Sequence, residues 1–114
     1  MKYRALFLLA CATTACGTTP DDRPATFEFV TLAVLAPACG TVACHSTTTN
    51  VSGYAFDTLP AARLALRRLV TTGNPDGSRL IDVIKRNKMP PDAPMFDDDV
   101  ALLSTWIRNG AQGL

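Results

Sequence analysis

The segment that most constrains this chain is a pair of cysteines followed at once by a histidine: Cys39-Gly40-Thr41-Val42-Ala43-Cys44-His45. His45 is the only histidine in the sequence. Two thiols beside an imidazole are the residues of the Cys-x-x-Cys-His motif, at which haem is attached covalently. Here four residues separate the cysteines, so that stretch must loop out, which Gly40 and its small neighbours permit. The segment therefore predicts a haem attachment site with an enlarged loop between its anchors.

The length and composition allow one small globular domain. The chain has 114 residues, of which 47% are hydrophobic and 18% are charged, a composition typical of folded proteins. A chain of this size buries a modest core, and such domains often need a cofactor or a covalent link for stability. The formal net charge is only +1, which provides no basic field for nucleic acid. Nucleic acid is therefore not expected as a partner.

The first 15 residues have the composition of an export signal. A basic start at residues 1–4 precedes an apolar run at residues 5–10, which is far shorter than the roughly 20 residues of a membrane-spanning helix. Cys11 and Cys16 each follow an alanine, as in a bacterial lipoprotein signal. The usual length of such signals favours Cys16 as the lipidated residue. The alternatives are lipidation of Cys11 and a plain secreted protein cut near Ala15.

We therefore expect an exported protein on the periplasmic side of the cell envelope, anchored to a membrane by lipid. Residues 16–26 would form the linker, because Pro20, Pro24 and their polar neighbours oppose regular structure. An extracytoplasmic compartment also permits disulfides. It follows that Cys39 and Cys44 have two covalent options, each other or haem.

The hydrophobic pattern predicts an all-α fold, with no strand of any length. Residues 25–36 carry apolar side chains at helical spacing, with Thr26 as the N-cap and Pro37 as the residue that ends the helix. A second helix is expected over Leu59–Leu69, where Pro60 suits the first turn.

Two further helices are expected after a turn at residues 72–78. Asn74 or Asp76 is the expected N-cap of the third helix, and Asp97 that of the last. Gly110 fits a left-handed C-terminal cap. The buried stripes of these helices are Leu80, Val83 and Ile84, and then Val100, Leu103, Trp106 and Ile107.

The loop at residues 87–96 carries the candidates for the sixth iron ligand. Its prolines require an extended backbone, and it contains Met89 and Met95. Because the sequence has no second histidine, a methionine is the natural partner for His45, and Met/His ligation raises the potential of haem iron. Met89 is the stronger candidate since Pro90 constrains its backbone, whereas Met95 suits the core.

Four motifs in this order resemble a small class I cytochrome c domain of the planctomycete or myxobacterial type. They are the Cys39–His45 segment, GNPDGSRL at residues 73–80, Met-Pro-Pro at 89–91 and WIRNGA at 106–111. The resemblance covers roughly residues 27–112. It implies an all-helical domain wrapped round one covalent haem c, which exchanges single electrons with redox partner proteins of the envelope.

The resemblance also implies roles for individual residues. Cys39 and Cys44 would form the thioether bonds, His45 would be the proximal iron ligand and Met89 the distal one. Most such domains have two residues between the cysteines, where this chain has four. We expect the haem pocket to be lined by Tyr54, Phe56, Leu66, Leu69, Leu80, Ile84 and Trp106.

Other interpretations of the same residues stay open. Cys39 and Cys44 can form a disulfide in a haem-free lipoprotein that acts as a binding module. A zinc site would combine them with His45 but would lack a fourth cysteine or histidine. A haem sensor, in which a small gas displaces Met89, is a third alternative. Trp106 is either a core residue or a donor to a haem propionate. No motif points to an enzyme.

Overall fold

The computed structural model of the protein describes residues 20–114, and within this range it contains helices and no β-strand. The expected all-α class is therefore confirmed for the described part of the chain. None of its helices has the length and apolar content needed to cross a membrane. The predicted signal at residues 1–15 and both candidate lipidation cysteines lie outside the described residues.

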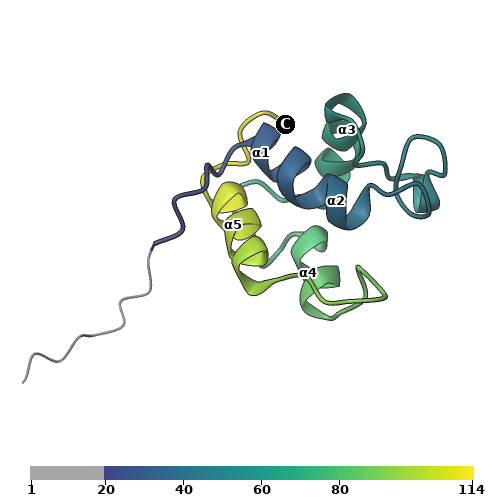
Figure 1. Ribbon diagram of the computed structural model, residues 1–114. Helices are drawn as coiled ribbons and strands as arrows, with labels where there is room; N and C mark the ends of the chain where they lie inside the picture. The colour runs from purple at the N-terminus through teal and green to yellow at the C-terminus, as the bar shows by residue number, and fades with distance from the viewer. Residues whose placement is uncertain (1–19) are drawn as a thin grey trace, which may run out of the picture.

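The first helical segment lies across the last helix, and two shorter helices complete the bundle (Figure 1). Each helix packs its apolar residues into one shared core. The α-helices are α1 (Phe27–Phe29), α2 (Ala36–Cys39), α3 (Leu59–Leu69), α4 (Arg79–Lys85) and α5 (Asp97–Arg108).

The first helical segment continues past the proline that was expected to end it. α1 passes into a π-helical stretch, Val30–Leu35, which passes into α2. In this stretch the Ala36 N–H bonds the Thr31 carbonyl, five residues back. The wider turn makes room for Pro37, which has no N–H and whose ring crowds an α-helical carbonyl. The prediction that Pro37 ends the helix was wrong, and the last turn of the segment instead carries Cys39.

α3 has the predicted bounds. The Thr58 hydroxyl caps it by accepting the Ala61 N–H at 3.4 Å, and Pro60 lies in the first turn. Arg67 and Arg68 are exposed. The buried face of α3 consists of Ala62, Ala65, Leu66 and Leu69.

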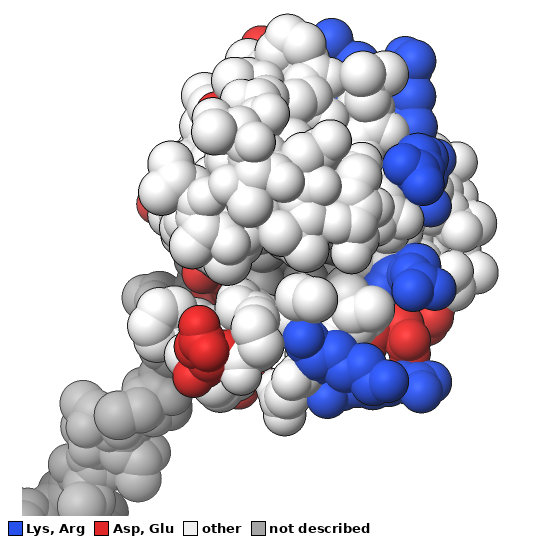
Figure 2. All heavy atoms as spheres, turned by 90° about the vertical axis from the view of Figure 1, so that its right-hand side faces the viewer, with Lys and Arg blue, Asp and Glu red and all other residues white. Residues whose placement is uncertain are grey.

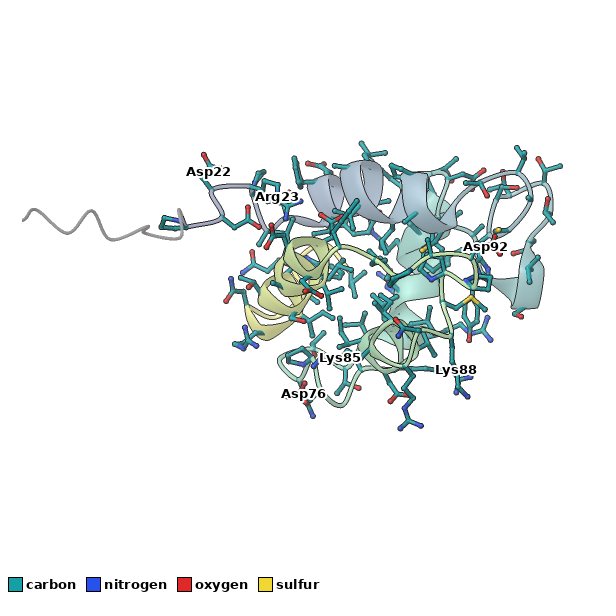
Figure 3. The ribbon with its side chains drawn as sticks, turned by 60° about the horizontal axis from the view of Figure 1, so that its bottom comes forward. Asp22, Arg23, Asp76, Lys85, Lys88 and Asp92 are labelled. Atoms are coloured by element: carbon teal, nitrogen blue, oxygen red, sulfur yellow. The ribbon has the colours of Figure 1, made fainter. Side chains whose placement is uncertain are left out.

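The N-cap predicted for α4 was wrong. The residue before the helix is Ser78, and its hydroxyl does not bond the helix but donates to the Asn74 carbonyl at 2.8 Å. Asn74 uses its own side chain inside the turn, where it accepts the Gly77 N–H at 2.9 Å. Asp76 pairs with Lys85 at 3.0 Å (Figure 3). Both predicted caps are therefore engaged elsewhere, because the turn folds back on itself before α4 begins.

α5 begins one residue earlier than predicted. Phe96 is the residue before the helix, so Asp97 is helical instead of capping it. Three aspartates occupy the first turn, where they complement the helix dipole. One of them, Asp99, also pairs with Arg23 of the linker. At the other end Gly110 has φ +99°, which confirms the predicted left-handed cap.

Trp106 belongs to the core at the start of the first helical segment. It is 1% exposed, lies with its ring centroid 6.4 Å from that of Phe27, and donates its indole N–H to the Gln112 carbonyl at 3.1 Å. Phe27 begins the helical segment that Cys39 ends, so Trp106 lies far from the cysteines. Its position is that of a core residue. The indole N–H, which was considered as a donor to a haem propionate, is already bonded to the Gln112 carbonyl.

The π-helical stretch leaves one buried hydroxyl without a partner. Thr31 is fully buried, and its Oγ1 has no hydrogen bond to any described residue. An unsatisfied buried hydroxyl is unfavourable, so we expect Thr31→Val to raise the free energy of unfolding by about 1 kcal/mol. Urea denaturation of the purified protein, followed by circular dichroism, measures this change. Thr105→Val, at an exposed position of α5, is the control, and a loss of stability at Thr31 alone would contradict the argument.

Candidate functional site

An irregular loop, residues 40–58, contains His45 and connects α2 with α3 (Figure 1). The His45 N–H donates to the Cys39 carbonyl at 3.0 Å, and the His45 carbonyl accepts the Phe56 N–H at 2.7 Å. The Cys44 N–H donates to the Thr41 carbonyl at 2.9 Å. This last bond closes a β-turn, so a tight turn takes up the longer spacing between the cysteines. Both backbone groups of His45 are thereby fixed beside Cys44.

The His45 imidazole is held through one of its two nitrogens. Its Nδ1 lies 2.9 Å from the Val51 carbonyl oxygen and 3.3 Å from that of Tyr54. Carbonyl oxygens only accept hydrogen bonds, so Nδ1 must carry the proton in this arrangement. Among the described residues Nε2 has no hydrogen-bond partner. A neutral imidazole held in this way presents the lone pair of Nε2 for coordination.

Two aromatic rings enclose the imidazole. Phe56 and Tyr54 meet it edge to face, with ring centroids 5.7 and 6.3 Å from that of His45. His45 is 9% exposed, Phe56 is buried and Tyr54 is half-buried. Two of the three aromatic residues predicted for the pocket, Tyr54 and Phe56, therefore lie beside the predicted ligand.

The two cysteines are free thiols and both are half-buried. Burial raises the pKa of Cys39 to about 11, and the negative charge of a Cys44 thiolate adds to this effect. Within residues 20–114, Cys39 and Cys44 are therefore not joined by the disulfide that the binding-module alternative requires. Both sulfur atoms are available for another covalent partner.

A carboxylate closes the outer part of the loop. Asp57 accepts the Thr47 N–H at 2.9 Å and the Thr47 hydroxyl at 2.8 Å. The backbone bond from Thr47, followed by the hydroxyl bond, holds the pKa of Asp57 below its ordinary value. The buried Ser46 hydroxyl accepts the Thr49 N–H at 3.2 Å. Sequence reasoning missed this network, because the partners Thr47 and Asp57 show no recognisable spacing.

The two methionines differ in their surroundings. Met89 is 37% exposed, whereas Met95 is half-buried against the core. The Met89 N–H donates to the Val83 carbonyl at 3.2 Å, as does the Lys88 N–H at 3.0 Å. The start of the loop is thus pinned to α4, and the Lys88 and Asp92 side chains lie on this loop in Figure 3. The predicted distal ligand has a fixed backbone and a side chain that reaches solvent.

Two open cavities lie away from His45. One, of about 520 Å³, is bounded by the end of α4, the loop after it and α5, and its lining includes Ile84 and Met95. The other, of about 450 Å³, lies at the start of α1, and its lining includes Phe27, Arg63 and Trp106. Neither cavity is lined by the cysteines or by His45. The remaining predicted pocket residues, Leu66, Leu69 and Leu80, are buried in the common core.

The loop that carries Cys44 and His45 has no charged residue over residues 40–56. Figure 2 shows this end of the molecule as a broad uncharged area, bordered along one edge by Lys and Arg side chains. An uncharged surface is suited to an apolar cofactor or to close contact with another protein.

The residues fit covalent attachment of haem better than a zinc site. Within residues 20–114, no group of three or more His, Cys, Asp or Glu is placed to hold a metal ion. Covalent haem instead needs two thiols and one oriented imidazole, together with an apolar pocket for the macrocycle. Cys39 and Cys44 are unbonded, and the Nδ1 proton of His45 is held by backbone carbonyls, as is usual for a metal-binding histidine.

Comparison with known proteins leaves the family open: no family model, no curated protein and no solved structure matches this chain.

The raised pKa of Cys39 predicts slow alkylation in the haem-free chain. The thiolate is the reactive form, and a pKa about two units above the ordinary 9.0 leaves roughly a hundredfold less thiolate at neutral pH. We expect iodoacetamide to label Cys39 more slowly than Cys44, with a Cys39 rate that keeps rising up to about pH 11. Mass spectrometry of peptides separates the two sites. A Cys39 rate that levels off below pH 9 would contradict this.

Gly40 is expected to tolerate no side chain. A Cβ there would lie 2.9 Å from the Ala36 carbonyl oxygen, the Asp57 nitrogen and the Phe56 carbonyl carbon. We expect Gly40→Ala to lower the free energy of unfolding by about 2 kcal/mol, because backbone atoms cannot yield as side chains do. Gly73→Asn is the comparison: its Cβ meets nothing within 4 Å, and asparagine tolerates the positive φ. Equal stability of the Gly40→Ala chain and the unmodified chain would refute the close packing.

Proposed function

We propose that the chain is a monohaem c-type cytochrome with a cytochrome c-like helical domain, which carries single electrons between partners in the cell envelope. The observation that carries the proposal is the state of His45. Its Nδ1 is engaged by the Val51 and Tyr54 carbonyls, and its Nε2 is not hydrogen-bonded among the described residues. This preorganised imidazole directly follows one of two unbonded thiols.

In this proposal each residue of the segment has one task. Cys44 and Cys39 hold haem through thioether bonds, and His45 binds the iron through Nε2. Bound haem supplies an iron centre that alternates between two oxidation states. Phe56 and Tyr54 restrict the imidazole to one orientation. Met89 is the proposed distal ligand.

The proposed location is the periplasmic side of the envelope, with the domain anchored through lipid on Cys16, or on Cys11 in the alternative. The described chain enters the domain next to α1, at the other end of the first helical segment from Cys39 (Figure 1). The proposed tether would therefore join the described chain at the opposite end of the first helical segment from the uncharged face of Figure 2. Redox proteins of the envelope are the proposed partners.

The test is covalent haem on the denatured protein. The full chain is expressed for export in a host that attaches c-type haem, and its gel band is stained for haem peroxidase activity. We expect a stained band in the unmodified chain and none in the Cys39→Ser, Cys44→Ser double variant. The single variants show which thiol bonds haem. An unstained band from well-folded, unmodified chain would reject the proposal and favour the haem-free binding module.

The distal ligand is tested in the haem-loaded chain. We expect Met89→Ala to abolish the methionine–iron charge-transfer absorption near the red end of the visible spectrum and to lower the reduction potential, since Met/His ligation raises it. Met95→Ala is the matched control from the same loop and should leave both properties unchanged. If Met95→Ala has the effect instead, the ligand assignment is wrong although the cytochrome proposal stands.

A further inference from the structure

Arg68 of α3 contacts the turn that holds His45. Its guanidinium carbon lies 4.8 Å from the centre of the Tyr54 ring, and one of its terminal nitrogens donates to the Gly53 carbonyl at 3.5 Å. The planar guanidinium thus stacks on the Tyr54 ring and also bonds the backbone of the residue before it. Arg67, the preceding residue on the same helix, has no such contact among the described residues.

The turn that Arg68 contacts carries both acceptors of the His45 Nδ1–H, the carbonyls of Val51 and Tyr54. Its backbone is strained at Ser52, whose φ is 57°, whereas Gly53 adopts its φ of 75° without strain. A strained turn persists only when its surroundings hold it. The contacts from Arg68 supply such support from α3, a helix that is itself anchored in the core.

We propose that Arg68 is a positioning residue for His45. It clamps Gly53 and Tyr54, so that the carbonyls of the turn keep the proton on Nδ1 and the imidazole in one orientation. This part concerns the protein alone. A second part rests on the proposed function. The permanent positive charge of Arg68 lies against the turn that holds the proposed iron ligand His45. This charge favours the reduced state of the iron, because it opposes the additional positive charge of the oxidised state.

The contrast with neighbouring arginines supports a specific role. Arg63, also on α3, is engaged at the other end of the molecule, where it lies over Phe27 and donates to the Gly113 carbonyl at 2.6 Å. Arg67 points to solvent. Removing the charge of Arg67 therefore changes the net charge as removal at Arg68 does, without touching the turn.

The first test measures backbone opening in the full chain as purified, whether or not it carries haem. Arg68→Gln should increase amide hydrogen exchange at Phe56, whose N–H bonds the His45 carbonyl, by about two- to fivefold, the factor that corresponds to one exposed cation–π contact. Exchange at Leu103 in the core should not change. Arg67→Gln should leave both rates unchanged, and Arg68→Lys should restore part of the protection.

The second test reports on the imidazole itself. In ¹⁵N spectra of the haem-free chain, His45 should be in the Nδ1–H tautomer, and Arg68→Gln should produce a mixture of tautomers. In the haem-loaded chain, Arg68→Gln should have a lower reduction potential than Arg67→Gln.

These outcomes separate the two parts. If Arg68→Gln matches Arg67→Gln in both exchange and tautomer, the positioning role is overturned. If the two variants differ in exchange and tautomer but have the same reduction potential, the charge effect is overturned. If no haem attaches to any variant, the proposed function fails while exchange and tautomer still decide the role of Arg68.

Discussion

The hydrogen bond from His45 Nδ1 to the backbone of the Val51–Tyr54 turn is the interaction on which the rest of the site depends. It requires the loop to fold back so that residues 51–54 lie beside His45. The hydrogen bonds from Phe56 to His45 and from Thr47 to Asp57 hold the loop in this conformation. It also requires the end of α2 to approach the returning strand of backbone closely, and only a glycine at position 40 allows this. The loop is irregular in shape, yet hydrogen bonds hold both backbone groups of His45 and its Nδ1.

The first helical segment determines where that loop begins. Its π-helical stretch absorbs Pro37 without breaking the helix, so the helix extends to Cys39 and its carbonyl accepts the His45 N–H. The cost is the unpartnered Thr31 hydroxyl in the same stretch. Had the helix ended at Pro37, Cys39 would lie on flexible chain and its distance from Cys44 would not be fixed. The segment thus contains an unpartnered buried hydroxyl, while its last turn fixes the position of Cys39.

Local signals predicted the parts of this structure that local forces determine. The bounds of α3 and the left-handed conformation of Gly110 follow from periodicity and capping. The cap predicted for α4 was wrong because Asn74 bonds within its own turn and Asp76 pairs with Lys85. The cap predicted for α5 was wrong because the helix begins one residue earlier, after Phe96. The contacts of Arg68 and Asp57 could not be predicted, since their partners lie ten or more residues away and depend on how the loop folds.

In the proposed cytochrome the two sides of the iron would differ in how firmly the protein holds them. His45 is fixed by its backbone, its Nδ1 and two aromatic rings before any ligand is present. Met89 is fixed only through its backbone amide, and its side chain is exposed. Because a rigid ligand dictates position and a free one adapts to it, His45 would set the location of the iron and Met89 would follow. Substitutions around His45 should therefore alter the position of the iron, whereas substitutions around Met89 should alter how tightly the distal ligand binds it.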